Sequence, residues 1–458
     1  MESEWPSYPL EQLCAANTAI TYGVVKPGPE DSNGVLFVRG GDIINGQINL
    51  GQLRTITHEV SQQYKRTLLK GGEILVSLVG NPGQVAIAPA VLRGANIARQ
   101  VGLIRLREDI DKQFIKYYLL SPLGQRELSG YSLGSVQQVI NLQDLKRVEI
   151  PLPTLEEQKA IAHILGTLDD KIELNRQMNA TLEAMAQALF KSWFVDFDPV
   201  IDNALAAGNP IPPELQARAE KRAALGDNRK PLPSEIQQLF PDRFTFTDEM
   251  GWVPEGWEGA SLSEFGQIVC GKTPSKSNPE YFGSKIPFIK IPDMHNEMFV
   301  IGSSDYLSEA GAATQPKKAI PRGSVCVSCI ATVGKVVIAS QESHTNQQIN
   351  SIVPNDTWLT PYLYFYMLTL NKLFHDLASG GSTTLNMNTG VFSKIEINRP
   401  NDSVLKAFHK ETSPMTNKIE AYLMEIDTLV KLRDTLLPKL LSGQLRIPEA
   451  EQQVAEVL

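Results

Sequence analysis

The chain has 458 residues, of which 42% are hydrophobic and 21% charged, and its formal net charge is −8. This composition is typical of soluble globular proteins, and the length allows two or three domains with cores of their own. No stretch of about 18 apolar residues occurs and no apolar segment follows Met1, so we expect no membrane span, no signal peptide and a cytoplasmic location. The acidic excess lies in residues 151–250 and 401–458, whereas 1–150 and 251–400 are nearly neutral. The net charge therefore does not exclude a nucleic-acid partner.

The second half of the chain repeats the first. Trp5 recurs as Trp257, residues 72–77 as 323–328, residues 83–88 as 334–339, and residues 114–119 as 362–367. A long period that occurs only twice is not a solenoid. It predicts one large unit that has been duplicated once.

Each copy shows the same order of local patterns. Short β-type runs come first, at 35–39, 74–79, 85–88 and 102–106 in copy one. A helical stretch follows, at 111–120 and 361–370, and then a Gly/Ser-rich loop, at 130–135 and 380–382. A last apolar strand runs into Pro153 or Pro400. The order predicts a compact mixed α/β domain of about 150 residues.

After each domain the apolar spacing changes to that of a long helix. Thr154 and Glu157 form a capping box, which marks a helix start. The a/d spacing that follows marks a coiled coil, and the two helices are each other's expected partners. The seam and interface residues are Leu165, Leu168, Ile172, Asn175, Asn179, Leu182, Ala186, Leu189 and Trp193 in the first helix and Ile419, Tyr422, Ile426, Leu429, Arg433, Leu436 and Leu440 in the second. We expect the polar Asn175 and Asn179 to fix the register.

Each domain joins the N-terminal end of its helix, so an antiparallel pair would carry the domains at opposite ends. The seam of about 28 residues would span about 42 Å, near the ~34 Å that separates half-sites on DNA. The helix pair would then act as a ruler. The alternative is that each apolar stripe packs on its own domain.

We therefore expect an α/β fold class, with two pseudo-repeated globular mixed α/β domains separated by a long antiparallel two-helix coiled coil. The expected parts are domain one at 1–153, helix one at 154–195, a Pro-rich linker at 196–250 with one helix near 213–225, domain two at 251–400, helix two at 401–445, and a tail at 446–458.

No catalytic or metal site is expected. Cys326 and Cys329 have metal-like spacing, but their repeat counterparts are Leu75 and Leu78, which indicates core packing. Residues 266–273 match a phosphate-binding loop by letter, yet the turn-forming Pro274 to Pro279 run follows instead of a helix. No adenine methyltransferase motif and no nuclease constellation is present.

Several stretches resemble the DNA specificity subunit of type I restriction-modification systems. They are Ile150-Pro-Leu-Pro-Thr-Leu-Glu-Glu-Gln158, Leu165-Gly-Thr-Leu-Asp-Asp-Lys-Ile172, Phe190-Lys-Ser-Trp-Phe-Val-Asp-Phe197, Leu436-Leu-Pro-Lys-Leu-Leu-Ser-Gly-Gln444, Pro254-Glu-Gly-Trp257 and Gly271-Lys-Thr-Pro274. The second helix departs from the pattern, because it lacks the Glu-Glu-Gln sequence and Pro414 is expected to break it.

The resemblance implies two target-recognition domains that read one bipartite, asymmetric site in double-stranded DNA. It implies two adenine methyltransferase subunits and two restriction/translocase subunits as partners. S-adenosylmethionine, ATP and Mg would be used by those partners, with no cofactor and no catalytic residue in this chain.

Base reading needs polar side chains on loops, and both copies supply them. The turn between paired strands offers Asn81, Gln84, Thr332 and Lys335, and the Gly-rich loop offers Ser135, Gln137, Gln138, Ser382, Thr383 and Asn386. Arg99, Gln100 and Gln347 are weaker candidates, and Lys272, Thr273 and Lys276 are expected to contact phosphates. Any of these positions could equally be a solvated turn.

Two alternatives remain open from the sequence. The chain could be a protein scaffold with two binding domains on a helical rod, or a nucleotide hydrolase that uses Lys272. Salt-dependent DNA affinity and a nucleotide-binding assay would separate them from DNA reading.

Overall fold

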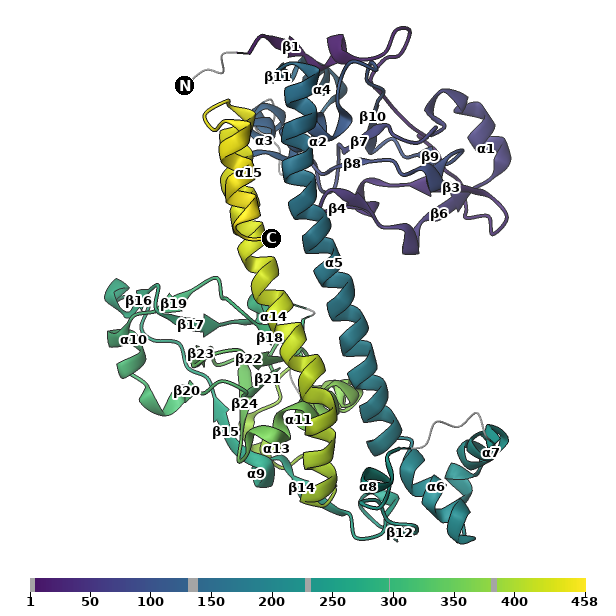
Figure 1. Ribbon diagram of the computed structural model, residues 1–458, viewed down its shortest axis with the longest axis vertical. Helices are drawn as coiled ribbons and strands as arrows, with labels where there is room; N and C mark the ends of the chain where they lie inside the picture. Colours follow the sequence, from purple (N-terminus) through teal and green to yellow (C-terminus); the bar gives the residue numbers. More distant parts are fainter. Residues whose placement is uncertain (1–4, 131–138, 227–231, 296, 380–384) are drawn as a thin grey trace. The chain divides into compact units, whose positions relative to one another are not determined.

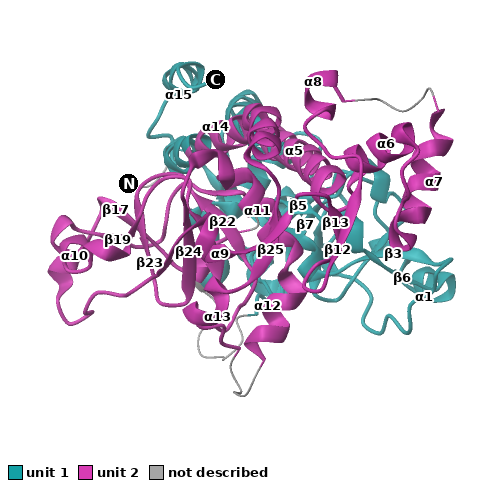
Figure 2. Cartoon of the chain, turned by 90° about the horizontal axis from the view of Figure 1, so that it is seen from below, with its two compact units in different colours: residues 1–173, 428–458 teal, residues 174–427 magenta. Residues whose placement is uncertain are grey.

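The computed structural model describes residues 5–130, 139–226, 232–295, 297–379 and 385–458 (Figure 1). The chain forms two compact units, residues 1–173 with 428–458 and residues 174–427, which Figure 2 shows in teal and magenta. Each long helix is thus divided between the units. Within the described ranges, no helix combines the length and apolarity needed to cross a membrane.

The domain in unit 1 is built on two small sheets. The antiparallel sheet has the order β2 (Thr21–Tyr22), β10 (Val101–Ile104), β7 (Ile74–Ser77), β8 (Val85–Ile87). The second has the order β6 (Arg54–Ile56), β3 (Val35–Val38), β9 (Asn96–Ile97), with β3 and β9 parallel. Between them lies an apolar core that includes Val38, Leu75 and Ile97. The strands and helix expected from the sequence are confirmed.

The remaining elements of unit 1 frame these sheets. A hairpin joins β4 (Ile43–Ile44) to β5 (Gln47–Ile48), and β1 (Ser7–Pro9) pairs with β11 (Glu149–Pro151). The helices are α1 (His58–Gln63), α2 (Lys112–Leu120), α3 (Pro122–Gly130), α4 (Leu142–Arg147) and, near the C-terminus, α15 (Ile447–Ala455). Asp111 caps α2 by accepting a hydrogen bond from Phe114 N at 2.9 Å.

Unit 2 repeats this topology with additions. Its first sheet has the order β15 (Gly266–Cys270), β24 (Ile349–Pro354), β21 (Val325–Ser328), β22 (Val336–Ala339), β18 (Phe299–Val300). Its second sheet has the order β16 (Phe282–Gly283), β19 (Tyr306–Leu307), β17 (Ile286–Ile289), β23 (Ser343–Thr345), β20 (Ala319–Ile320). Val76 pairs with Val85 in β7 and β8, as Val327 pairs with Val336 in β21 and β22. The repeat seen in the sequence is therefore a repeat of strand register.

The helices of the domain in unit 2 follow the same order. They are α9 (Leu262–Phe265), α10 (Glu309–Ala313), α11 (Thr360–Thr369), α12 (Asn371–Ala378) and α13 (Thr389–Ser393). β14 (Glu258–Ser261) pairs with β25 (Glu396–Arg399), as β1 pairs with β11 in unit 1.

The segment 196–250 was expected to be a Pro-rich linker with one helix near 213–225, and its described residues, 196–226 and 232–250, form more regular structure than that. It carries α6 (Asp198–Ala207), α7 (Gln216–Ala224), α8 (Ser234–Gln237) and the strand β12 (Phe244–Thr247), which pairs with β13 (Gly251–Pro254). Arg218 donates two hydrogen bonds of 2.7 Å to the buried Asp198, and Arg222 pairs with Asp202. Bidentate pairs of this kind hold α7 against α6.

The two long helices are α5 (Leu155–Phe194) and α14 (Asp402–Leu441). Unit 1 contains the first half of α5 and the second half of α14, and unit 2 contains the other two halves. This is the order expected for an antiparallel pair of helices. The capping box is present, with Glu157 N donating to Thr154 Oγ1 at 3.3 Å and Thr154 N to Glu157 Oε2 at 3.0 Å.

The expected seam is largely buried. Leu165, Leu168, Ile172, Asn175, Asn179, Ala186, Trp193, Ile419, Ile426, Leu429, Leu436 and Leu440 are buried, whereas Leu182, Leu189 and Tyr422 are half-buried. In unit 2, Phe190, Trp193 and Phe194 lie within about 6 Å of the ring of Phe408 on α14. Phe190 and Phe194 also contact Tyr362 of the domain, so the stripe packs on both surfaces.

Pro414 does not break the second helix, and that expectation was wrong. The helix α14 continues through it to Leu441. Proline lacks the N–H that would bond to the carbonyl of Lys410, four residues earlier. The hydroxyl of Ser413 donates to that carbonyl at 3.4 Å, which replaces part of the lost bond.

Candidate nucleic-acid interface

The turn after the central strand has the same construction in both domains. Gly83 N donates to Ser77 O at 2.9 Å, and Gly334 N donates to Ser328 O at 3.0 Å. Both glycines have positive φ, at 88° and 90°. Ala331 also has a positive φ of 65°, where copy one has Gly80. A non-glycine residue in this region costs roughly 1–3 kcal/mol, so the surrounding contacts must hold the turn in place.

The polar residues of this turn divide into two kinds. Asn81 and Thr332 are exposed at its tip. Gln84 accepts a hydrogen bond from Asn45 N at 3.1 Å, and the Lys335 ammonium donates to Met294 O at 2.9 Å. Asn81 and Thr332 are thus exposed to solvent, whereas Gln84 and Lys335 brace the turn.

A side-chain amide that was not predicted from the sequence supports each turn. Gln125 Nε2 donates to Gly83 O at 2.9 Å and to Leu119 O at 2.7 Å. Asn371 Nδ2 donates to Gly334 O at 3.4 Å. Gln125 lies inside α3 and Asn371 is the first residue of α12. The repeat that aligns 114–119 with 362–367 places Gln125 opposite Leu373, so the sequence repeat could not have identified this pair.

The Gly-rich loops fall mostly outside the described residues. This applies to Ser135, Gln137, Gln138, Ser382 and Thr383. Their described edges lie beside the turns, because Val139 forms a β-bridge with Val79 and Asn386 forms one with Ile330. Asn386 itself is exposed. The structure therefore brings the end of each Gly-rich loop to the turn of the same domain.

The segments around Arg99 and Gln347 also border the turns. Leu78 N donates to Gln100 O at 2.7 Å, and Cys329 N donates to Gln348 O at 2.8 Å. Arg99 is exposed and Gln100 is half-buried. Gln347 is exposed and accepts a hydrogen bond from Thr273 Oγ1 at 2.7 Å.

The loop with the phosphate-binding letters has no phosphate-binding geometry. β15 ends at Cys270, and the next regular element is a 3-10 turn at Pro279–Tyr281, not a helix that starts at Lys272. The amide of Lys272 donates to Thr345 O at 2.9 Å, so it is not free for a phosphate. The side chains of Lys272 and Lys276 are exposed, and Thr273 is half-buried. A nucleotide site is not supported.

The two cysteines with metal-like spacing are core residues. Cys326 and Cys329 are buried, and burial raises the pKa of the Cys326 thiol to about 12 and that of Cys329 to about 11. In the described part of the chain, no group of three His, Cys, Asp or Glu residues could hold a metal ion.

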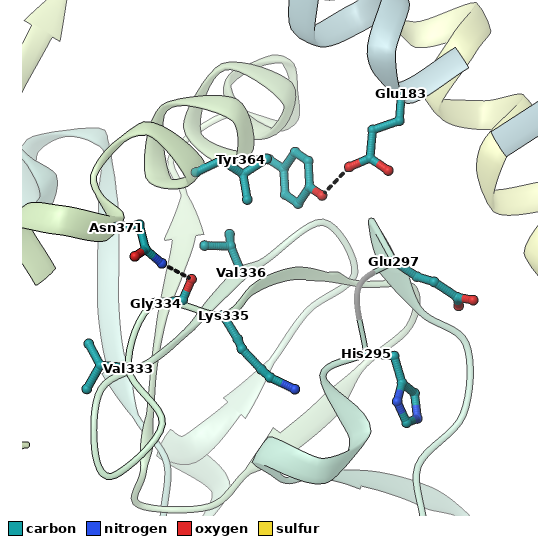
Figure 3. A pocket seen from close by; sticks show the side chains of 10 residues that line it. Glu183, His295, Glu297, Val333, Gly334, Lys335, Val336, Tyr364 and Asn371 are labelled. Atoms are coloured by element: carbon teal, nitrogen blue, oxygen red, sulfur yellow. Dashed lines mark hydrogen bonds between the residues drawn. The ribbon is translucent and has the colours of Figure 1, made fainter. Parts of the chain in front are cut away.

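A hollow of about 320 Å³ lies behind the turn of domain two (Figure 3). It is lined by Glu183 of α5, Tyr364 of α11, Lys335 of the turn, and His295 and Glu297. Tyr364 donates to the Glu183 carboxylate at 2.7 Å, and burial raises the pKa of Glu183 despite this bond. The hollow is therefore lined by residues of this turn, of α11 and of α5.

Comparison with known proteins identifies the same family for both halves. The family profile described as "Type I restriction modification DNA specificity domain" matches residues 2–184 and 254–420. The specificity subunit of the type I restriction enzyme HindI from Haemophilus influenzae is 38% identical over 437 residues, which cover 90% of this chain and 94% of the relative. The MjaIX specificity subunit of Methanocaldococcus jannaschii is 25% identical, over 86% of this chain and 83% of the relative.

A solved structure has the same fold. The S subunit of a type I restriction-modification system from M. genitalium matches with a TM-score of 0.56 and 16% identity, over 96% of both chains. The match of both halves to the family profile, and that of nearly the whole chain to a relative, leave one assignment. The chain belongs to the family of type I restriction-modification DNA specificity subunits.

Proposed function

We propose that this chain reads a bipartite, asymmetric site in double-stranded DNA, one half with each domain. The observation that carries the proposal is the pair of equivalent turns with different tips. The strand register and the backbone hydrogen bond from the turn glycine to the serine are the same in both domains, but the exposed tip carries Asn81 in one and Thr332 in the other. A shared framework with different polar side chains fits two readers of two different sequences.

The chain contributes no reaction of its own in this proposal. It holds two adenine methyltransferase subunits and two restriction/translocase subunits, which use S-adenosylmethionine, ATP and Mg. The complex acts in the cytoplasm, where its DNA is. These partners are inferred from the family. An exposed apolar stripe on α5 supports the methyltransferase as a partner.

The outer face of α5 offers an apolar stripe for a methyltransferase helix. Leu174, Met178 and Met185 are 53%, 38% and 55% exposed, and exposed Thr181 lies between them. Their spacing of four, three and four residues places them on one face of the helix. The first apolar seam of α5 is already buried within the chain. A second, exposed seam on the same helix is suited to packing against a helix of another protein.

The two long helices set the DNA spacer in this account. α5 and α14 are each 40 residues long, or about 60 Å at 1.5 Å per residue, and each carries residues of both units. Continuous helices resist bending, so the helix length fixes the distance between the half-sites.

Methylome sequencing tests the proposal. A host strain that carries this chain with its methyltransferase should gain methylated adenines in one asymmetric motif with two specific parts and a fixed spacer. The same strain with the methyltransferase alone is the control. If this chain adds no motif, while it still co-purifies with its partners, it is a protein scaffold and not a DNA reader.

A further inference from the structure

A short 3-10 turn with two adjacent basic residues occupies the same place in both domains. It spans Lys65–Thr67 in domain one and Pro316–Lys318 in domain two. The basic pairs are Lys65 with Arg66 and Lys317 with Lys318. Lys318 is half-buried and the other three are exposed. Among the residues that the structure describes, none of the four is in an ion pair.

The residue before each basic turn is hydrogen-bonded to another loop of its domain. That loop follows β2 in domain one and β15 in domain two. The Tyr64 hydroxyl accepts a hydrogen bond from Val25 N at 3.4 Å. Gln315, which is only 5% exposed, donates from Nε2 to Lys272 O at 2.7 Å. Exposed Lys26 and Lys272 therefore lie next to the basic turns of their domains.

Close backbone packing fixes these loops. An added Cβ at Gly23 would lie 1.8 Å from Ile97 O, and one at Gly271 would lie 2.2 Å from Asn346 O. Only glycine fits such an approach. The loop in domain one is also bound by Arg99 N, which donates to Val24 O at 2.9 Å.

The same loops adjoin the candidate reading segments. In domain one they contact Arg99, and the neighbouring Gln100 is bonded to the strand that leads into the reading turn. In domain two Thr273 bonds to Gln347, and Gln348 is bonded to the equivalent strand. In each domain a series of hydrogen-bonded segments thus connects the turn proposed to read the bases with the basic turn.

We propose that each domain carries a basic platform that binds the phosphodiester backbone of duplex DNA beside its half-site. The basic platform is Lys26, Lys65 and Arg66 in domain one and Lys272, Lys317 and Lys318 in domain two. This proposal rests on the proposed function, because it assumes that the domains bind DNA. Its positive charge is kept in both copies while the tips of the reading turns differ. This is the pattern expected for a backbone contact, because the backbone is the same for every sequence.

The test compares matched double variants of the full chain, each of which removes two positive charges. K65A/R66A changes domain one, K317A/K318A changes domain two, and K221A/K410A is the control with two exposed lysines outside both domains. Binding is measured by titration of labelled duplexes against salt, with the duplex selected by the wild-type protein and with a scrambled one. Circular dichroism checks that each variant is folded.

Each platform variant should lower the slope of log affinity against log salt by about 1.8, because one phosphate contact contributes about 0.9. The loss should be equal for the selected and scrambled duplexes, and the control should keep the wild-type slope. An unchanged slope, an equal change in the control, or a changed base preference would overturn the platform. If the wild-type protein prefers no sequence, the proposed function fails first. If it prefers one and the variants keep its slope, only the platform fails.

Discussion

The phenol hydroxyl of Tyr117 donates a hydrogen bond of 2.8 Å to a carboxylate oxygen of Asp169. Arg433 donates to the other oxygen at 2.8 Å. One carboxylate thus joins the helix α2 of domain one to both long helices in unit 1. In unit 2 Tyr364, whose counterpart in the repeat is Lys116, donates to Glu183 on α5. A tyrosine of α2 and one of α11, at adjacent positions of the repeat, therefore anchor their domains to α5.

Replacing Tyr117 by Phe should destabilise unit 1. The change removes a hydrogen bond to a charged group, which is worth roughly 1.5–3 kcal/mol, although Arg433 still neutralises Asp169. We expect a lower midpoint in thermal or urea unfolding, and a similar effect of Tyr364→Phe in unit 2. Tyr8→Phe, at an exposed residue, is the control. Equal midpoints for Y117F and Y8F would show that the anchor does not contribute to stability.

The raised pKa of Glu183 predicts a pH dependence. Burial raises the pKa of Glu183 in the folded protein above its pKa in the unfolded chain. At pH values between these two pKa values, the folded state therefore binds more protons than the unfolded state. The stability contributed at this position therefore falls as pH rises above about 4.5. Glu183→Gln keeps an acceptor for Tyr364 and removes the penalty.

The E183Q variant should gain stability relative to wild type as pH rises from about 4 to 7. Urea unfolding at several pH values measures the difference, and E411Q, at an exposed position of α14, is the control. A difference that is constant with pH, or that shrinks toward pH 7, would contradict the burial of the charge.

The amide supports of the reading turns predict a loss of specificity confined to one domain. Gln125→Ala frees the turn of domain one, and Asn371→Ala frees that of domain two. Each should relax base preference in one half-site, at a cost on the order of 1–3 kcal/mol for the affected base pair. Sequence selection from random duplexes measures this, and each variant is the control for the other. Weaker binding to all sequences with unchanged preference would mean that the amides only stabilise the fold.

Much of the architecture could be predicted from local patterns. The capping box at Thr154, the seam from Leu165 to Trp193 and the repeated strands depend on spacing within a short window. The main errors depended on contacts that spacing does not show. Ser413 compensates for Pro414, and Arg218 and Arg222 reach the carboxylates on α6 from 20 residues away. The roles of Gln84 and Lys335 as braces could not be predicted, because their partners lie in other loops.

The ruler can be tested by lengthening both helices. One heptad inserted after Glu173 in α5 and another after Asp427 in α14 would keep the seam on one face and add about 10.5 Å. The preferred DNA spacer should grow by about three base pairs, at about 3.4 Å each, with both half-sites unchanged. A heptad in α5 alone is the control and should disrupt the pairing. An unchanged spacer in the folded double insertion would show that the helices do not set it.

In the proposed function each domain reads its own half of the DNA site. The most direct test replaces residues 5–150 by the corresponding domain of a relative and sequences the methylome of a host that carries the chimaera with the methyltransferase. We expect a new motif in which one half-site is changed, while the other half-site and the spacer are those of the wild type. A motif changed in both halves, or a change confined to the spacer, would contradict it.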